Sequence, residues 1–370
     1  MSTARIPSLD GIRAVAVWLT IGHHIVGRFL PGSSSHWLEA LGRGGDGVGV
    51  FFVLSGFLIT KLLIEEKERT GTIDLGDFFL RRAFRILPPL YMYLIFAVLF
   101  AHAVGIELPP SSLIGASLFV GDYWPAESSF LTEHTWSLGV EEQFYLLWPP
   151  ILIWSLARGG RALAAKVGGA IVLATPALRV AGYASGVDLL RHHGMHMFHA
   201  RMDSLMCGCV VALCIGAPAF ERCYRAYARV WWIGPLYTLL VSGLLTGLDQ
   251  PLGATRLGTA YTMVIGLTVD SALTAMFILW ASRNAHSLAG RFLNQPLMVR
   301  MGVLSYSAYL WQTALIHERN PTFLAAWPWM LLYIWIAAAA SYYGVERHAL
   351  SIRRRIERWR GSRKALLGAA

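Results

Sequence analysis

Ionisable side chains in the first long apolar segment are the residues of this sequence best suited to chemistry. Arg13 and His24 are eleven residues apart, so on a helix they lie within about 20° of one face, with Asp10 about 40° away. An ionisable group in hydrocarbon costs about 2.5–3.5 kcal/mol and therefore faces a cavity or a partner. A lone histidine would be interpreted as structural, but this charged stripe predicts a functional site. A neutral imidazole near pH 7 is suited to act as a base.

A second group is Arg81, Arg82 and Arg85, which is followed by Pro88 and Pro89. Arginines three or four residues apart share a helix face and present forked donors that suit phosphate. Positive residues that anchor a membrane helix on its cytoplasmic side would have the same spacing. On spacing alone, the two interpretations are equally good.

Acidic residues form a third group. Glu141 and Glu142 enter an apolar run and point to different faces, so one can reach a cavity while the other stays near the headgroups. Tyr145 follows one turn later. Arg201 and Asp203 stand at the start of a further apolar run. They are either site residues or a local ion pair.

Histidines and cysteines form two further clusters. His192, His193, His196 and His199 have a spacing that suits a metal if the segment is helical, but no carboxylate or cysteine is nearby to complete the shell. We therefore predict a loop at the membrane surface and no metal site. Four cysteines lie within residues 207–223, and free buried thiols are the expected state.

The composition indicates the class of protein to which these residues belong. Of 370 residues, 55% are hydrophobic and only 15% charged, with a mean hydropathy of +0.49. These values exclude disordered, collagen-like and coiled-coil classes and argue against a soluble protein. The net charge of +10 could indicate nucleic-acid binding, but the charges lie between apolar runs rather than on a soluble basic face.

The sequence predicts an all-α, polytopic integral membrane protein with about ten transmembrane helices. One transmembrane domain covers residues 1–346, and a basic tail on anionic headgroups covers 347–370. The 111–121 stretch is too short to cross and is expected to be re-entrant or interfacial. The predicted spans are 10–30, 46–64, 86–105, 143–157, 167–185, 202–218, 230–248, 257–282, 301–318 and 327–345.

Basic residues predict the orientation. With the N-terminus inside, the inside segments hold 24 of the 32 Lys and Arg residues, which predicts an N-in/C-in topology. No cleavable signal peptide is expected, because the first apolar run carries charges and no small-residue cleavage site follows it.

Several motifs in this order resemble those of the acyltransferase-3 family of integral-membrane O-acyltransferases, over about residues 5–350. The motifs are Ile6–Ala14 with His24, Gly47–Ile59, Arg81–Pro88, Trp136–Tyr145, Arg201–Asp203, Ser305–Trp311 and Val345–Arg347. Two positions depart from the family pattern. Gln312 stands where a histidine is common, so no catalytic role is carried to it, and His348 stands where a proline is common.

The resemblance implies transfer of an acyl group, commonly acetyl from acetyl-CoA, to a hydroxyl of a carbohydrate or small natural product. His24 would be the base or a transient acyl carrier, with Arg13 and Glu141 as further catalytic residues and Glu141 orienting His24. Arg82 and Arg85, with Arg81, would bind the coenzyme A phosphates. The expected substrate-binding residues are Glu142, Tyr145, Arg201, Asp203 and Asp10.

The resemblance also implies a route. Acyl-CoA would enter from the cytoplasm, a continuous cavity would connect Arg82 and Arg85 with His24, and the acceptor would approach from outside a bacterial cytoplasmic (inner) membrane. Because the chain ends 25 residues after the last predicted span, any second transfer is expected to need another protein. The alternative functions are a transporter or flippase of a glycan or anionic small molecule, for which no inverted repeat is visible, and a scaffold protein. The oligomeric state is not predicted.

Overall fold

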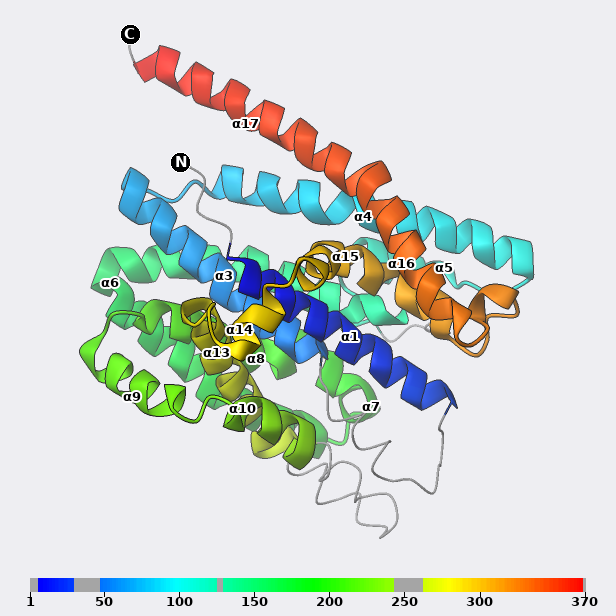
Figure 1. Ribbon diagram of the computed structural model, residues 1–370, viewed down its shortest axis with the longest axis horizontal. Helices are drawn as coiled ribbons and strands as arrows, with labels where there is room; N and C mark the ends of the chain where they lie inside the picture. The colour runs from blue at the N-terminus through cyan, green and yellow to red at the C-terminus, as the bar shows by residue number, and fades with distance from the viewer. Residues whose placement is uncertain (1–5, 30–46, 125–128, 243–261, 369–370) are drawn as a thin grey trace.

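The computed structural model describes residues 6–29, 47–124, 129–242 and 262–368, and the described chain is helical without any strand (Figure 1). Its longer helices are α1 (Pro7–Phe29), α3 (Gly47–Thr70), α4 (Leu75–Val104), α6 (Trp136–Ala184), α8 (Phe198–Cys214), α13 (Leu267–Arg283), α15 (Pro296–Ile316), α16 (Trp329–Ser341) and α17 (Arg347–Gly368). The shorter helices are α5 (Pro110–Ser117), α7 (Asp188–His193), α9 (Pro218–Ala228), α10 (Ile233–Leu236) and α14 (Leu288–Leu293).

Five helical segments in the described chain are long and apolar enough to cross a membrane: Gly47–Thr70, Leu75–Val104, Glu133–Ala184, Gly194–Cys214 and Val264–Arg283. Large apolar side chains such as Leu99, Leu146 and Leu173 are exposed on these segments, as hydrocarbon solvation requires. The all-helical membrane class is therefore confirmed, whereas the number of ten spans and the orientation remain predictions. Residues 30, 46, 243–248 and 257–261 of the predicted spans lie outside the described chain.

The predicted runs 143–157 and 167–185 both lie in α6, which contains a break. Gly159 and Gly160 have non-helical backbone angles, and the φ of Gly160 is 63°, in the left-handed region that glycine tolerates best. The break falls between the two predicted runs. Most of the short stretch at 111–121 lies in α5, which has eight residues and cannot cross a bilayer.

Glycines allow the central helices to approach closely. A Cβ added at Gly302 on α15 would lie 1.8 Å from the carbonyl oxygen of Asp10 on α1. Likewise, a Cβ at Gly208 on α8 would lie 2.1 Å from the carbonyl oxygen of Val53 on α3. Backbones this close favour helix packing in a membrane, where apolar surface gives little driving force. The α1–α15 contact fixes the depth of Asp10 and its neighbour Arg13.

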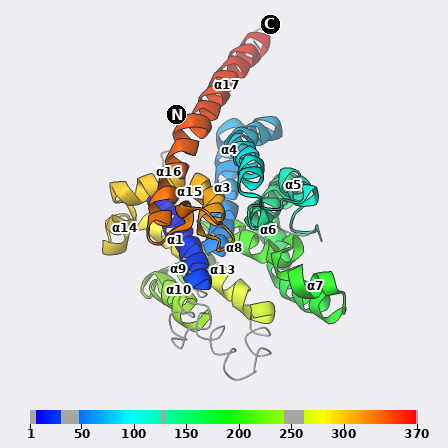
Figure 2. The same cartoon turned by 90° about the vertical axis from the view of Figure 1, so that its right-hand side faces the viewer.

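The C-terminal helix α17 leaves the helical body and continues past the start of α4 in both views (Figures 1 and 2). Arg360 on α17 binds Asp77 on α4 at 3.1 Å, and Arg353 pairs with Glu357. The predicted basic tail is therefore a helix for as far as it is described. Its association with lipid headgroups remains a prediction.

A buried ion pair joins α6 to α8. Arg179 and Asp203 are 2.8 Å apart, both side chains have no solvent exposure, and Thr268 also donates to Asp203. The sequence suggests a local pair between Asp203 and Arg201, but in the structure Asp203 pairs with Arg179. Arg201 donates to the carbonyl of Met195 and lies over the ring of Trp136.

Arg179→Met should destabilise the protein by about 3–5 kcal/mol, because it leaves the Asp203 carboxylate buried without its cation. Thermal unfolding in a fixed detergent measures the loss. Arg161→Met is the matched control: Arg161 pairs with Glu68 on the exposed surface, where a pair contributes at most about 1 kcal/mol. Equal loss in both variants would contradict the expectation, and adding Asp203→Asn should recover part of the stability of the Arg179 variant.

Candidate functional site

One pocket in the described chain gathers five of the residues predicted from the sequence: Arg13, Arg82, Arg85, Glu141 and Tyr145. It encloses about 670 Å³ of empty space, including its open mouth. Its other lining residues are Val48, Phe51, Phe52, Ser55, Ile86, Ser137, Leu138, Ser305, Tyr306 and Tyr309. Because these come from α1, α3, α4, α6 and α15, the pocket exists only when the five helices are packed. We call it the arginine pocket.

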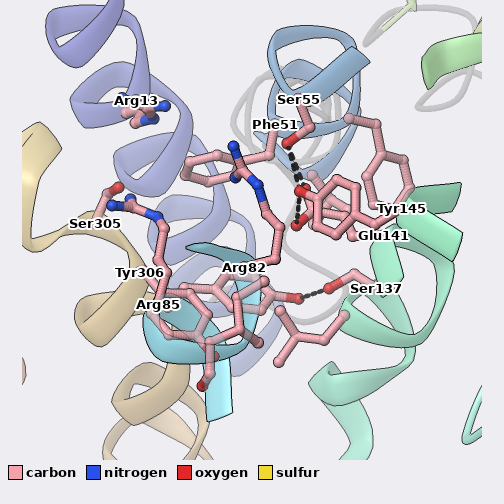
Figure 3. Close-up of a pocket in the computed structure, with 15 residues that line it drawn as sticks. Arg13, Phe51, Ser55, Arg82, Arg85, Ser137, Glu141, Tyr145, Ser305 and Tyr306 are labelled. Carbon is pink, nitrogen blue, oxygen red and sulfur yellow. Dashed lines mark hydrogen bonds between the residues drawn. The ribbon is translucent and has the colours of Figure 1, made fainter. Parts of the chain in front are cut away.

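Guanidinium groups form one side of the arginine pocket (Figure 3). Arg13 binds Asp10 at 2.8 Å, and Arg85 lies 3.9 Å from the fully buried carboxylate of Glu346. Arg82 lies over the ring of Tyr145, and its Nε atom is buried without a hydrogen-bond partner in the described structure. The three arginines lie close enough to repel one another electrostatically. This side of the pocket is therefore prepared for an anion.

Glu141 and two hydroxyls form the facing side (Figure 3). Ser55 donates to Glu141 Oε1 at 2.8 Å, and Tyr145 donates to Oε2 at 3.1 Å. These are the hydrogen bonds that the described structure gives this carboxylate, and His24 is not among its partners. The described structure thus shows no direct contact through which Glu141 would orient His24.

Local sequence explains how α4 presents its arginines. Asp74 caps its first turn by accepting from the backbone N–H of Asp77, and Gly105 ends it with a φ of 70°. Between them, the hydroxyl of Tyr306 on α15 donates to the carbonyl of Ile86 at 2.9 Å. This contact ties α15 to α4 one residue after Arg85.

His24 lies outside the residues that line the arginine pocket, so the pocket as described ends short of it. The ring centroids of His24 and His23 are 5.5 Å apart, and electrostatic interactions link His24 with His134 and His317. The described structure therefore surrounds His24 with other imidazoles.

His134 interacts electrostatically with His24 and contacts a residue of the pocket. It is buried, its Nδ1 atom lies 2.8 Å from the Thr313 hydroxyl, and its Nε2 atom has no hydrogen-bond partner in the described chain. Its carbonyl accepts from Tyr309, a pocket residue whose hydroxyl lies 2.6 Å from that of Ser137.

The remaining predicted residues do not line the pocket. Arg81 binds Glu66 at 2.9 Å. One oxygen of Glu142 is buried without a described hydrogen bond, and its charge interacts with Glu141 and Arg82. Asp10 is held by Arg13, and Asp203 by Arg179, so both carboxylates neutralise arginines.

The predicted histidine cluster spreads out. His199 Nδ1 lies 2.9 Å from the hydroxyl of Tyr123, and the ring of His196 lies 4.6 Å from that of Trp136. The side chain of His192 lies outside the described structure. Among the side chains that are described, no three potential ligands meet around a metal position. The four cysteines are free thiols; Cys207 and Cys209 are buried as expected, whereas Cys214 is half-buried and Cys223 is exposed.

Sequence analysis placed Ser55, Ser137, Tyr309 and Glu346 within family motifs without assigning them a role, and it missed His134. Glu346 follows directly on the last predicted span, and a carboxylate at that depth is a signal that could have made it a site candidate. Serine and tyrosine carry no charge and are not distinguished by their type within an apolar run. Their contacts distinguish them: Ser55 donates to Glu141, and the hydroxyl of Tyr309 lies 2.6 Å from that of Ser137.

Comparison with known proteins gives one family. The model of the acyltransferase-3 family, described as an acyltransferase domain, matches residues 6–345. An O-acetyltransferase, OatA, of Staphylococcus aureus (strain NCTC 8325 / PS 47) is 28% identical over 337 residues, covering 84% of this chain and 50% of the relative. A peptidoglycan O-acetyltransferase, OatA, of Listeria monocytogenes is 26% identical over 336 residues, covering 85% of this chain and 50% of the relative. The chain thus spans about half the length of these relatives, and no solved structure matches it.

Proposed function

The chain belongs to the acyltransferase-3 family, and from this premise we propose that it moves an acetyl group from acetyl-CoA to a hydroxyl of a carbohydrate. The single observation that carries the proposal is the arginine pocket, in which three guanidinium groups face Glu141, Ser55 and Tyr145. Relatives named O-acetyltransferase support the acetyl group, and a relative named for peptidoglycan supports a carbohydrate acceptor.

Arg82 and Arg85 would hold the coenzyme A phosphates, since forked guanidinium donors match phosphate oxygens. Arg13 would stand beside the pantetheine arm or polarise the thioester carbonyl. Arg81 is the weaker candidate for binding phosphate, because its guanidinium group is already paired with Glu66. In the N-in orientation, the coenzyme would enter from the cytoplasm and the acceptor from the outside of the bacterial cytoplasmic membrane.

His24 would take the proton of the acceptor hydroxyl as that oxygen attacks the thioester carbonyl. The carbon–sulfur bond then breaks, and the proton passes to the thiolate to give free coenzyme A. An alternative sequence acylates His24 first and the acceptor second. From Arg13 to His24 is about 16 Å along a helix axis, so the pantetheine arm would extend past Tyr309 and His134 to reach it.

The purified protein in lipid nanodiscs, given acetyl-CoA labelled in the acetyl group, should release coenzyme A and place the label on a sugar hydroxyl. Mass spectrometry of the product locates the ester. A transporter or flippase would leave acetyl-CoA intact, and that result in the presence of a range of glycans would reject the proposed enzyme.

A further inference from the structure

A second pocket of about 930 Å³ lies where α5 meets the start of α6, and it shares no residue with the arginine pocket. Its lining residues are Ser111, Ser112, Gly115, Ala116, Gly121, Asp122, Trp124, Thr132, Glu133, Thr135, Trp136, His193 and His196. We call it the acidic pocket. Nothing in the proposed use of the arginine pocket explains it.

The two pockets adjoin along the first turn of α6. Thr135 and Trp136 line the acidic pocket, whereas the next two residues, Ser137 and Leu138, line the arginine pocket. A helix rises about 1.5 Å per residue, so the wall between the pockets is a single helical turn. A ligand in one pocket is therefore close to a ligand in the other.

The acidic pocket lies beyond the arginines along α4. Tyr91 on α4 donates to the carbonyl of Ser117 at the end of α5, and Tyr93 donates to the carbonyl of Leu131, next to Thr132 of the pocket. Arg85 and Tyr93 are about 12 Å apart along the axis, so the acidic pocket lies beside the middle of α4. In the proposed N-in orientation, it lies on the outer side of the arginines, where an acceptor would arrive.

The charges of the two pockets are opposite. The acidic pocket contains the carboxylates of Asp122 and Glu133, the imidazoles of His193 and His196, and no lysine or arginine among its described lining residues, whereas the arginine pocket contains three arginines and one carboxylate, Glu141. Burial raises the pKa of Asp122 to about 6, so its carboxyl is mostly ionised at neutral pH. An anionic donor such as coenzyme A is repelled here, and a neutral or cationic ligand is favoured.

Four hydroxyl side chains and two carboxylates line the acidic pocket. Ser112 and Thr132 are hydrogen-bonded to each other, Thr135 donates to the carbonyl of Thr132, and Asp122 accepts from Gln143 and from the backbone N–H of Phe198. The second carboxylate, Glu133, is exposed, and the remaining lone pairs of both carboxylates suit the hydroxyls at the edge of a sugar ring. Trp124 is 47% exposed and offers an apolar face. The empty space of about 930 Å³, which includes the open mouth, is large enough to admit a small organic ligand.

We propose that the acidic pocket binds the acceptor, and that this acceptor is a neutral or amino-bearing pyranoside whose ring packs on Trp124 and whose hydroxyls bind Asp122 and Glu133. This inference rests on the proposed function, in which the acyl group passes from coenzyme A to the acceptor. One sugar hydroxyl then faces the turn at Thr135–Ser137. Its oxygen forms the ester bond to the acyl carbon, the carbon–sulfur bond breaks, and its proton ends on the thiol of coenzyme A.

Saturation-transfer difference NMR on the full chain in nanodiscs tests the pocket without any acyl donor. The probes are chitotriose, its fully deacetylated amino form, and a trimer of galacturonate. We expect the first two to bind and the anionic trimer to bind at least ten-fold more weakly. Trp124→Ala should lower binding about ten-fold, and Glu133→Gln should selectively weaken the amino form. Both side chains are accessible to solvent, so neither change removes a core residue.

Trp329→Ala is the matched control, because Trp329 is also exposed but does not line the pocket. Equal binding by the anionic trimer, absence of binding by both other trimers, or the same affinity in the Trp124 and Trp329 variants would overturn the inference. Transfer kinetics separate it from the proposed function. If labelled acetyl reaches a sugar but Trp124→Ala leaves the acceptor KM unchanged, the pocket assignment fails alone. If the sugar binds as expected but acetyl-CoA is never consumed, the proposed enzyme fails alone.

Discussion

His24→Ala is expected to lower acyl transfer by about 10²–10⁴-fold, the usual contribution of a positioned acid–base group. The imidazole lies outside the arginine pocket, so binding of coenzyme A should change little. Single-turnover transfer from labelled acetyl-CoA measures the chemical step, and equilibrium binding of coenzyme A measures the donor site. A fall in both by the same factor would point to misfolding and would contradict this role.

His23→Ala is the matched control, because His23 neighbours His24 on the same helix and is exposed. Its transfer rate should stay within about three-fold of the unsubstituted protein, because the His23 side chain is exposed and takes no part in the proposed reaction. An equal loss of transfer rate in both variants would contradict a specific role for His24. Brief incubation with labelled acetyl-CoA alone distinguishes the two chemical alternatives: label retained on the protein and absent from His24→Ala indicates an acyl-histidine.

Arg82→Ala and Arg85→Ala should each weaken coenzyme A binding by about 10–100-fold. A charge-assisted hydrogen bond to phosphate contributes about 1.5–3 kcal/mol, and both guanidinium groups line the pocket. Isothermal titration with coenzyme A, and with the same molecule lacking its 3′-phosphate, measures the loss. Arg82→Lys keeps the charge but loses the forked donors, so an intermediate affinity is expected.

Arg81→Ala provides the comparison on the same helix. Arg81 binds Glu66 and does not line the pocket, so coenzyme A affinity should change less than about three-fold. If Arg81→Ala weakens binding as much as Arg82→Ala, the three arginines act as a diffuse basic surface and the pocket does not select the phosphate. If neither Arg82 nor Arg85 affects binding, the donor lies elsewhere.

Much of this arrangement could be predicted from the sequence. Apolar runs gave the positions of the helices, because burial of the backbone in hydrocarbon requires about twenty apolar residues per crossing. The sequence predicts two separate apolar runs at 143–157 and 167–185, and the structure breaks α6 between them at Gly159 and Gly160. Charges within apolar runs identified Arg13, Arg82, Arg85 and Glu141 as site candidates, because such groups need a cavity or a partner.

The partners themselves were not predictable in this way. Glu141 is bound by Ser55 and Tyr145 rather than by His24, Arg85 lies beside Glu346, and Asp203 pairs with Arg179 rather than with Arg201. Each of these contacts except the one from Tyr145 joins helices that are distant in sequence. Helical periodicity specifies which residues share a face of one helix, but it carries no information about the helix packed against that face.

The sequence by itself determined that this chain is a helical membrane protein with ionisable groups held inside its apolar segments, because composition and spacing control solvation directly. Only the tertiary structure decided that three arginines from α1 and α4 face a carboxylate on α6, and that a separate acidic pocket adjoins them across one turn. Those decisions depend on close packing between helices, as at Gly302 and Asp10, where backbone geometry and not hydrophobicity sets the distance.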